Sequence, residues 1–149
     1  MPVKIAAPIV QVFTLDKTDE TYAVEGPPST VTIKQARESE HIIRQGYFAK
    51  LEQRWSGVHP QEVTVVQNLG LEELARLEAR LTVVDCNLED ENGKRIFNPS
   101  KDPGSMKLAM SAQQFDEAWG KLPLDVADEI HEKVLEMNPQ WAGSSGEGS

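Results

Sequence analysis

The sequence has a single cysteine, Cys86, among 149 residues. One thiol excludes an internal disulfide and is typical of a protein from a reducing compartment. Residues 1–5 lack the apolar core of a signal peptide, and no apolar run approaches the roughly 20 residues of a membrane-spanning helix. These absences predict a soluble cytoplasmic protein.

A basic surplus is also missing, because the formal net charge is -9. Binding to phosphates needs cations that displace counterions, so we expect neither nucleic acid nor an anionic membrane surface as the main partner. The acidity is partly local, since residues 111–149 hold eight acidic residues against two lysines.

Motifs for chemistry are absent too. His131 and the glutamate after it would begin a zinc-protease motif, but Leu135 stands where the second histidine is required. Cys86 follows Asp85, whose charge disfavours the reactive thiolate. No glycine-rich loop is present that could hold a phosphate group. We therefore predict no catalytic, cofactor-binding or metal site, and no enzyme.

The length fits one domain at residues 1–141, with a β-hairpin region (1–28) and a mostly helical part (29–141). Residues 142–149 are glycine- and serine-rich and predict a flexible tail. Residues 9–15 and 21–24 are rich in β-branched and aromatic residues and flank a polar stretch, which is typical of a hairpin. The expected fold class is mainly α (α+β), a helical domain with a small N-terminal β-hairpin.

The next segment has two interpretations. Thr32 and Gln35 match a capping box, which predicts a helix to about Trp55. Alternatively, residues 31–33 continue the sheet and the helix starts near Ser39. The buried stripe of this helix is expected to be Ala36, Ile43, Tyr47, Leu51 and Trp55.

Further along, residues 58–67 fit either strand or helix, whereas residues 71–84 have leucines at helical spacing. Asn92-Gly93 predicts a turn, after which residues 95–97 pair back briefly. Ser111 and Gln114 match a second capping box and predict a short helix.

The clearest helix covers residues 123–137. Pro123 suits its first turn, acidic residues follow where they complement the helix dipole, and Asn138-Pro139 ends it. The apolar stripe of this helix either docks on the protein's own core or fills a groove on a partner. The candidate partner-binding residues are Leu122, Val126, Ile130, Val134, Met137 and Trp141.

Three features resemble the tail assembly chaperones of long-tailed (siphovirus-like) bacteriophages. The first is the segment 122–130 followed by residues 138–141, Asn-Pro-Gln-Trp. The second is the run 77–87, followed by Asn-Gly-Lys at 92–94 and Ile-Phe at 96–97. The third is the order of a hairpin, a Thr-Ile-Lys segment and a helix. Together they cover about two thirds of the chain, and none is a catalytic signature.

Members of this family are small, acidic and largely helical, and they coat the tape measure protein and recruit tail tube subunits onto it before tail assembly. The resemblance implies a non-catalytic chaperone in the host cell cytoplasm, absent from the mature virion, and often accompanied by a longer frameshifted form. Its implied partners are the tape measure protein, the tail tube protein and a neighbouring copy in a homo-oligomer. The alternatives are a virion structural component, such as a minor tail or connector protein, and a bacterial adaptor or regulatory module.

Overall fold

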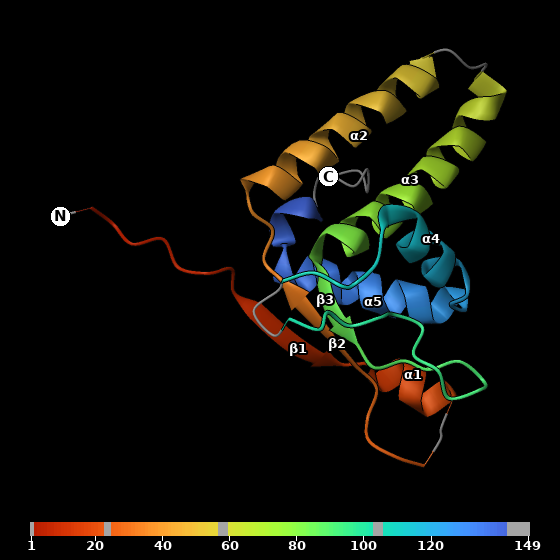
Figure 1. Ribbon diagram of the computed structural model, residues 1–149. Coiled ribbons are helices and arrows are strands. Elements are labelled where there is room, and N and C mark those ends of the chain that lie inside the picture. The colour runs from red at the N-terminus through yellow and green to blue at the C-terminus, as the bar shows by residue number, and fades with distance from the viewer. Residues whose placement is uncertain (1, 23–24, 57–59, 103–105, 143–149) are drawn as a thin grey trace.

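A small antiparallel sheet and five helices make up the part of the chain that the computed structural model describes, residues 2–22, 25–56, 60–102 and 106–142 (Figure 1). The elements follow in the order β1 (Val10–Thr14), α1 (Asp16–Thr21), β2 (Thr30–Lys34), α2 (Glu38–Ser56), α3 (Pro60–Thr82), β3 (Val83–Cys86), α4 (Ala112–Gly120), α5 (Leu124–Met137) and the 3-10 turn η1 (Pro139–Trp141). The expected fold class, mainly α (α+β), is confirmed. The predicted tail lies almost entirely outside the described residues.

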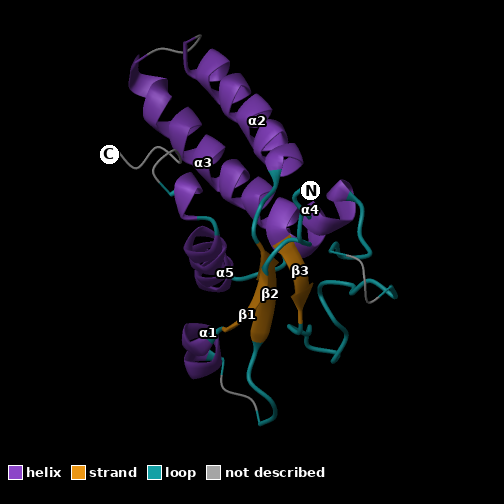
Figure 2. Ribbon diagram, turned by 90° about the vertical axis from the view of Figure 1, so that its left-hand side faces the viewer, coloured by secondary structure: helices purple, strands orange, loops and turns teal. Residues whose placement is uncertain are grey.

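The three strands lie in the order β1-β2-β3, and both pairs are antiparallel (Figure 2). The predicted hairpin is therefore wrong in its second strand. Residues 16–21 form α1, and β1 pairs with β2, with Val10 opposite Lys34 and Thr14 opposite Thr30. Residues 23–24 of the predicted strand lie outside the described residues.

Helix α1 exists because of a contact from far along the chain. It has no side-chain cap of its own. Instead, the Glu129 carboxylate on α5 accepts hydrogen bonds from the N–H groups of Lys17 and Thr18, each 2.9 Å, and from the Thr18 hydroxyl at 2.7 Å. A carboxylate at a helix N-terminus satisfies unpaired donors and complements the helix dipole. Local sequence contains no sign of this partner.

Helix α2 begins at Glu38, so the alternative interpretation, with residues 31–33 in the sheet, is confirmed. The prediction of a capping box at Thr32 is wrong, because Thr32 lies within β2 and pairs with β1 and β3. Pairing on both sides of the strand supplies more backbone hydrogen bonds than a single capping box does.

The buried face of α2 differs from the predicted stripe. Leu51 is buried and Tyr47 is half-buried, but Ile43 is 50% exposed. The charged side chains of Glu40 and Arg44 point inward instead. Ala36, also in the predicted stripe, precedes the helix, and the side chain of Trp55 lies outside the described residues.

Helix α3 packs against α2 as the second arm of a long antiparallel pair (Figure 1). The ambiguous residues 58–67 are helical from Pro60 onward, while residues 58–59 lie outside the described part. Gly70 lies inside this helix. A Cβ at Gly70 would lie 2.8 Å from a methyl carbon of Leu51, so a larger residue there would require the Leu51 side chain to shift. The helix predicted to reach residue 84 ends at Thr82, where β3 begins.

The last third of the described chain follows the predictions. Gly93 has φ 76° in the expected turn, and Glu89 and Arg95 form an antiparallel bridge after it. The capping box of Ser111 and Gln114 is present at the start of α4. The predicted terminal helix is α5, and η1 continues beyond it.

The main core lies between the sheet and the helices α4 and α5, and its largest members are Leu15, Val31, Ile33, Phe97, Phe115, Ile130, Val134 and Trp141. A second, smaller cluster of Leu51, Leu74 and Leu77 joins α2 to α3. In the described ranges, no helix combines the length and apolar character needed to span a membrane.

Candidate functional site

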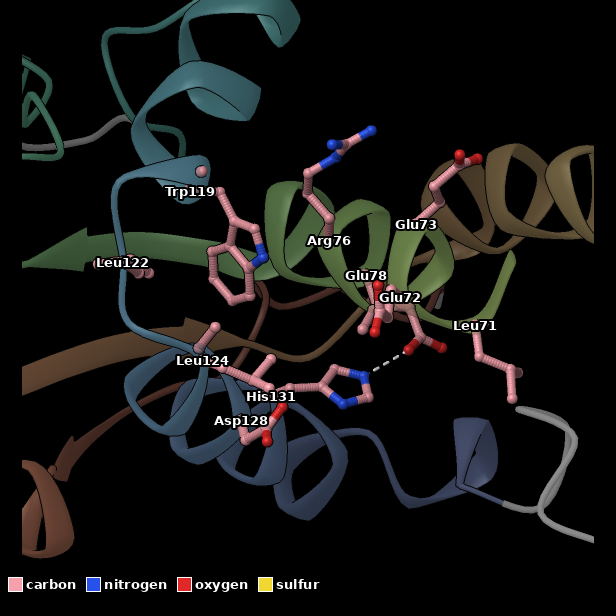
Figure 3. A pocket seen from close by; sticks show the side chains of 13 residues that line it. Leu71, Glu72, Glu73, Arg76, Glu78, Trp119, Leu122, Leu124, Asp128 and His131 are labelled. Atoms are coloured by element: carbon pink, nitrogen blue, oxygen red, sulfur yellow. Dashed lines mark hydrogen bonds and ion pairs between the residues drawn. The ribbon is translucent and has the colours of Figure 1, made fainter. Parts of the chain in front are cut away.

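A groove of about 550 Å³ lies between α3, α4 and α5 and is here named the α3–α5 groove (Figure 3). Helix α3 forms one wall, the end of α4 and the following loop form the top, and the first half of α5 forms the other wall. Its lining is Leu71, Glu72, Glu73, Ala75, Arg76, Glu78, Trp119, Gly120, Leu122, Leu124, Ala127, Asp128 and His131.

Apolar side chains line the groove and are accessible to solvent. Leu124 is 69% exposed, while Leu71, Trp119 and Leu122 are each half-buried. The Trp119 ring stacks on Phe115 at 5.9 Å, and Phe115 in turn lies 5.5 Å from Phe97 in the core. This chain of aromatic rings fixes the indole before any partner binds. A partly accessible tryptophan beside an exposed apolar side chain is typical of a protein-binding surface.

Acidic groups surround this apolar lining. Glu72 and Asp128 are exposed on opposite walls. Arg76, a basic residue of α3 in the lining, forms an ion pair with Asp116 on α4, with its Nε 3.3 Å from the carboxylate. Near the apolar groups the charge is therefore predominantly negative, which favours a partner carrying basic side chains.

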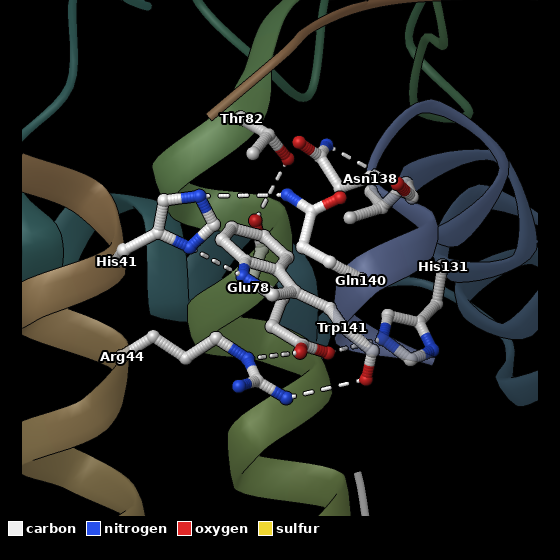
Figure 4. Close-up of polar contacts among 9 residues, drawn as sticks. His41, Arg44, Glu78, Thr82, His131, Asn138, Gln140 and Trp141 are labelled. Atoms are coloured by element: carbon white, nitrogen blue, oxygen red, sulfur yellow. Dashed lines mark hydrogen bonds and ion pairs between the residues drawn. The ribbon is translucent and has the colours of Figure 1, made fainter. Parts of the chain in front are cut away.

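The floor of the groove contains a buried charged network centred on Glu78 (Figure 4). One carboxylate oxygen accepts from Arg44 Nε at 2.6 Å, and the other lies 2.7 Å from His131 Nε2. The side chains of Arg44 and Glu78 are 2% and 0% exposed, whereas that of His131 is 20% exposed and lines the groove. The network connects α2, α3 and α5, so it holds both groove walls in place.

Trp141 is anchored on the far side of the same network. Arg44 donates from Nη2 to its carbonyl at 3.3 Å, and the Arg44 guanidinium lies 5.3 Å from the centre of the indole ring. The indole N–H donates to Nδ1 of His41 at 3.0 Å. Both partners lie on α2, and Trp141 is only 1% exposed.

The predicted partner-binding residues are divided between the α3–α5 groove and the main core. Leu122 lines the groove. Val126, Ile130, Val134 and Trp141 are buried in the main core, and Met137 is half-buried against it. This placement favours the interpretation in which the stripe docks on the protein's own core. A partner role for the buried members stays a prediction.

Sequence reasoning missed the buried polar groups that position the site. Arg44, Glu78 and Glu129 look like ordinary surface residues in a helical pattern, and their partners lie 34 to 112 residues away. Asn138 was expected only to end α5. In fact it is fully buried, accepts from the N–H of Ala36 at 2.7 Å and donates to the carbonyl of Lys34 at 3.3 Å.

Two chemical roles, metal binding and catalysis by the Cys86 thiol, receive no support from the described residues. No group of three or more histidine, cysteine or acidic side chains there is placed to hold a metal ion. Cys86 is buried, and this burial raises the pKa of its thiol to about 11, so the thiol is protonated at neutral pH.

Comparisons of the chain with protein-family models, with curated proteins and with solved structures gave no significant match. The function is therefore argued from the groove and from the resemblance of the sequence.

Proposed function

We propose that this protein is a tail assembly chaperone of a long-tailed bacteriophage, which binds the helical tape measure protein through the α3–α5 groove. The observation that carries the proposal is the combination of an exposed apolar lining with an acidic border in a groove of about 550 Å³. The sequence segment with the strongest resemblance to that family, residues 122–130, forms one wall of it.

An amphipathic helix is the occupant that such a groove fits. Grooves between helices accept the apolar side chains of a partner helix at spacings of three and four residues. Leu124 and Trp119 would contact those side chains, and Glu72 and Asp128 would pair with basic groups flanking them. A net charge of -9 would then keep an apolar partner in solution after many copies have bound to it.

The proposed role is non-catalytic. The tape measure protein binds before the tail forms, and the chaperone leaves before the virion is complete. Recruitment of the tail tube protein and the location in the host cell cytoplasm are proposed from the sequence resemblance.

Co-expression with the tape measure protein of the same phage tests the proposal. We expect the tape measure protein to aggregate when expressed alone. Co-expression should give a soluble complex with many chaperone copies per tape measure, and size exclusion with light scattering measures that ratio. Leu124→Asp should abolish the complex, because it places a charge on the apolar lining. Ile42→Asp on α2 is the matched control, since Ile42 is 62% exposed and lies outside the groove.

Two results would overturn the proposal. One is the absence of a complex, and the other is a complex that Leu124→Asp and Ile42→Asp weaken equally. Finding the protein in purified virions would favour a structural component of the tail.

A further inference from the structure

Strand β1 is an edge of the sheet, and in the described ranges no strand pairs with its outer side. Hydrogen bonds at its two ends show which residues face outward. Leu15 donates to the carbonyl of Ser29, and Gln35 donates to the carbonyl of Ile9, both at 2.8 Å. In an antiparallel pair such bonds alternate, so the odd-numbered residues of β1 bond to β2. The even-numbered residues Val10, Val12 and Thr14 direct their N–H and C=O groups to the free edge.

The side chains at this edge are uncharged and mostly apolar. Val10 is 41% exposed, Val12 is 62% exposed and Ile9 is 63% exposed. No charged residue occurs from position 6 to position 15, in a chain with 26% charged residues. Natural edge strands are commonly protected by lysine, by proline or by a covering element. Here only Pro8, which has no N–H to donate, protects the edge against pairing with another strand.

A second copy of the chain is the partner that this edge fits best. Two chains with a net charge of -9 repel each other over most of their surface, but not along ten uncharged residues. The strand is also suited to a two-fold axis at Val12. About such an axis Val12 meets Val12 of the other copy, and each Val10 meets a Thr14. All three positions are outward-facing, so they form the hydrogen-bonded pairs.

We propose that β1 pairs antiparallel with β1 of a second copy, joining two three-stranded sheets into one of six strands. The N-terminal arm, residues 2–9, leads away from the body beside β1 (Figure 1), and its Val3 and Ile5 are 84% and 78% exposed. Five residue pairs make a small interface, so the dimer depends on concentration. The pairing uses β1 and not the α3–α5 groove, so its test is independent of the proposed function.

Sedimentation velocity of the full chain over a wide concentration range tests the pairing. We expect a monomer–dimer equilibrium. Val12→Lys should raise the dimer dissociation constant about tenfold or more, because it places two like charges directly opposite each other at the axis. Ile42→Lys is the matched control, since both residues are 62% exposed in the wild-type chain. Circular dichroism checks that both variants fold.

A cross-link gives a second readout. Hydrogen-bonded partners in an antiparallel pair have Cα atoms about 5.5 Å apart, within the range of a disulfide. Val12→Cys should therefore form a covalent dimer on mild oxidation, while Ile42→Cys should not. The native Cys86 is buried and does not compete. A monomer at every concentration, association unchanged by Val12→Lys, or equal cross-linking of both cysteine variants would overturn the proposal.

Discussion

Replacing Arg44 by methionine tests the buried network beneath the groove. Methionine keeps the apolar stem and removes the guanidinium. Glu78, which is fully buried, then keeps its 2.7 Å contact with His131 and loses the 2.6 Å bond from Arg44. Breaking a buried ion pair from one side typically costs about 3–5 kcal/mol. Because His131 remains beside the carboxylate, we expect a loss near the lower end, about 3 kcal/mol.

Such a loss is a large fraction of the roughly 5–15 kcal/mol that stabilises a typical domain. The assay is urea unfolding followed by circular dichroism, where the midpoint should fall by roughly 1–2 M. The double variant Arg44→Met/Glu78→Leu should recover part of the loss, since no uncompensated charge remains.

A solvent-exposed ion pair provides the control. Lys17 lies 3.1 Å from Glu132, with side chains 70% and 52% exposed. Lys17→Met should cost less than about 1 kcal/mol, because water screens such pairs. If Arg44→Met destabilised the protein no more than Lys17→Met does, the account of the network as the support of the groove walls would be refuted.

Three further predictions concern other buried groups. Glu129→Ala removes three hydrogen bonds to the start of α1 and should release that helix, which limited trypsin digestion at Lys17 would detect as faster cleavage than in the wild type. Burial alone would raise the pKa of Glu40, but hydrogen bonds from Ser39 and Lys34 hold it below the ordinary value of 4.5. The resulting stabilisation is complete above pH 4.5 and is lost as the pH falls through the lowered pKa of Glu40. In urea unfolding, Glu40→Gln should therefore lower the free energy of unfolding at pH 7, and by progressively less below pH 4.5. The Cys86 thiol, with its pKa raised to about 11 by burial, should react with a thiol reagent at pH 8 only after denaturant is added, and rapid reaction of the folded protein would contradict its burial.

Features with local causes could be predicted from the sequence. The capping box at Ser111, the turn at Gly93 and the stop at Asn138-Pro139 each depend on residues within a few positions of one another. The apolar spacing of α5 is equally local, and it identified the helix correctly. The same spacing could not tell whether the stripe faces the protein's own core or a partner, since both surfaces are apolar.

The errors occur where a distant partner decides the structure. Residues 16–21 form a helix because Glu129 caps them, and Thr32 lies in a strand because β3 arrives from position 83. Arg44 faces inward because Glu78 lies opposite it. The groove was missed for the same reason, since its walls come from α3, α4 and α5 and meet only in the folded chain.

Hydrogen exchange of this protein, free and mixed with the proposed tape measure partner, tests the central claim most directly. Residues 71–78 and 119–131 carry the groove lining, and the account predicts that their amides exchange more slowly in the complex than in the free protein. Exchange in the helical pair beyond the groove, around Ile42, should not change. Slower exchange around Ile42 with no change at the groove would contradict the account.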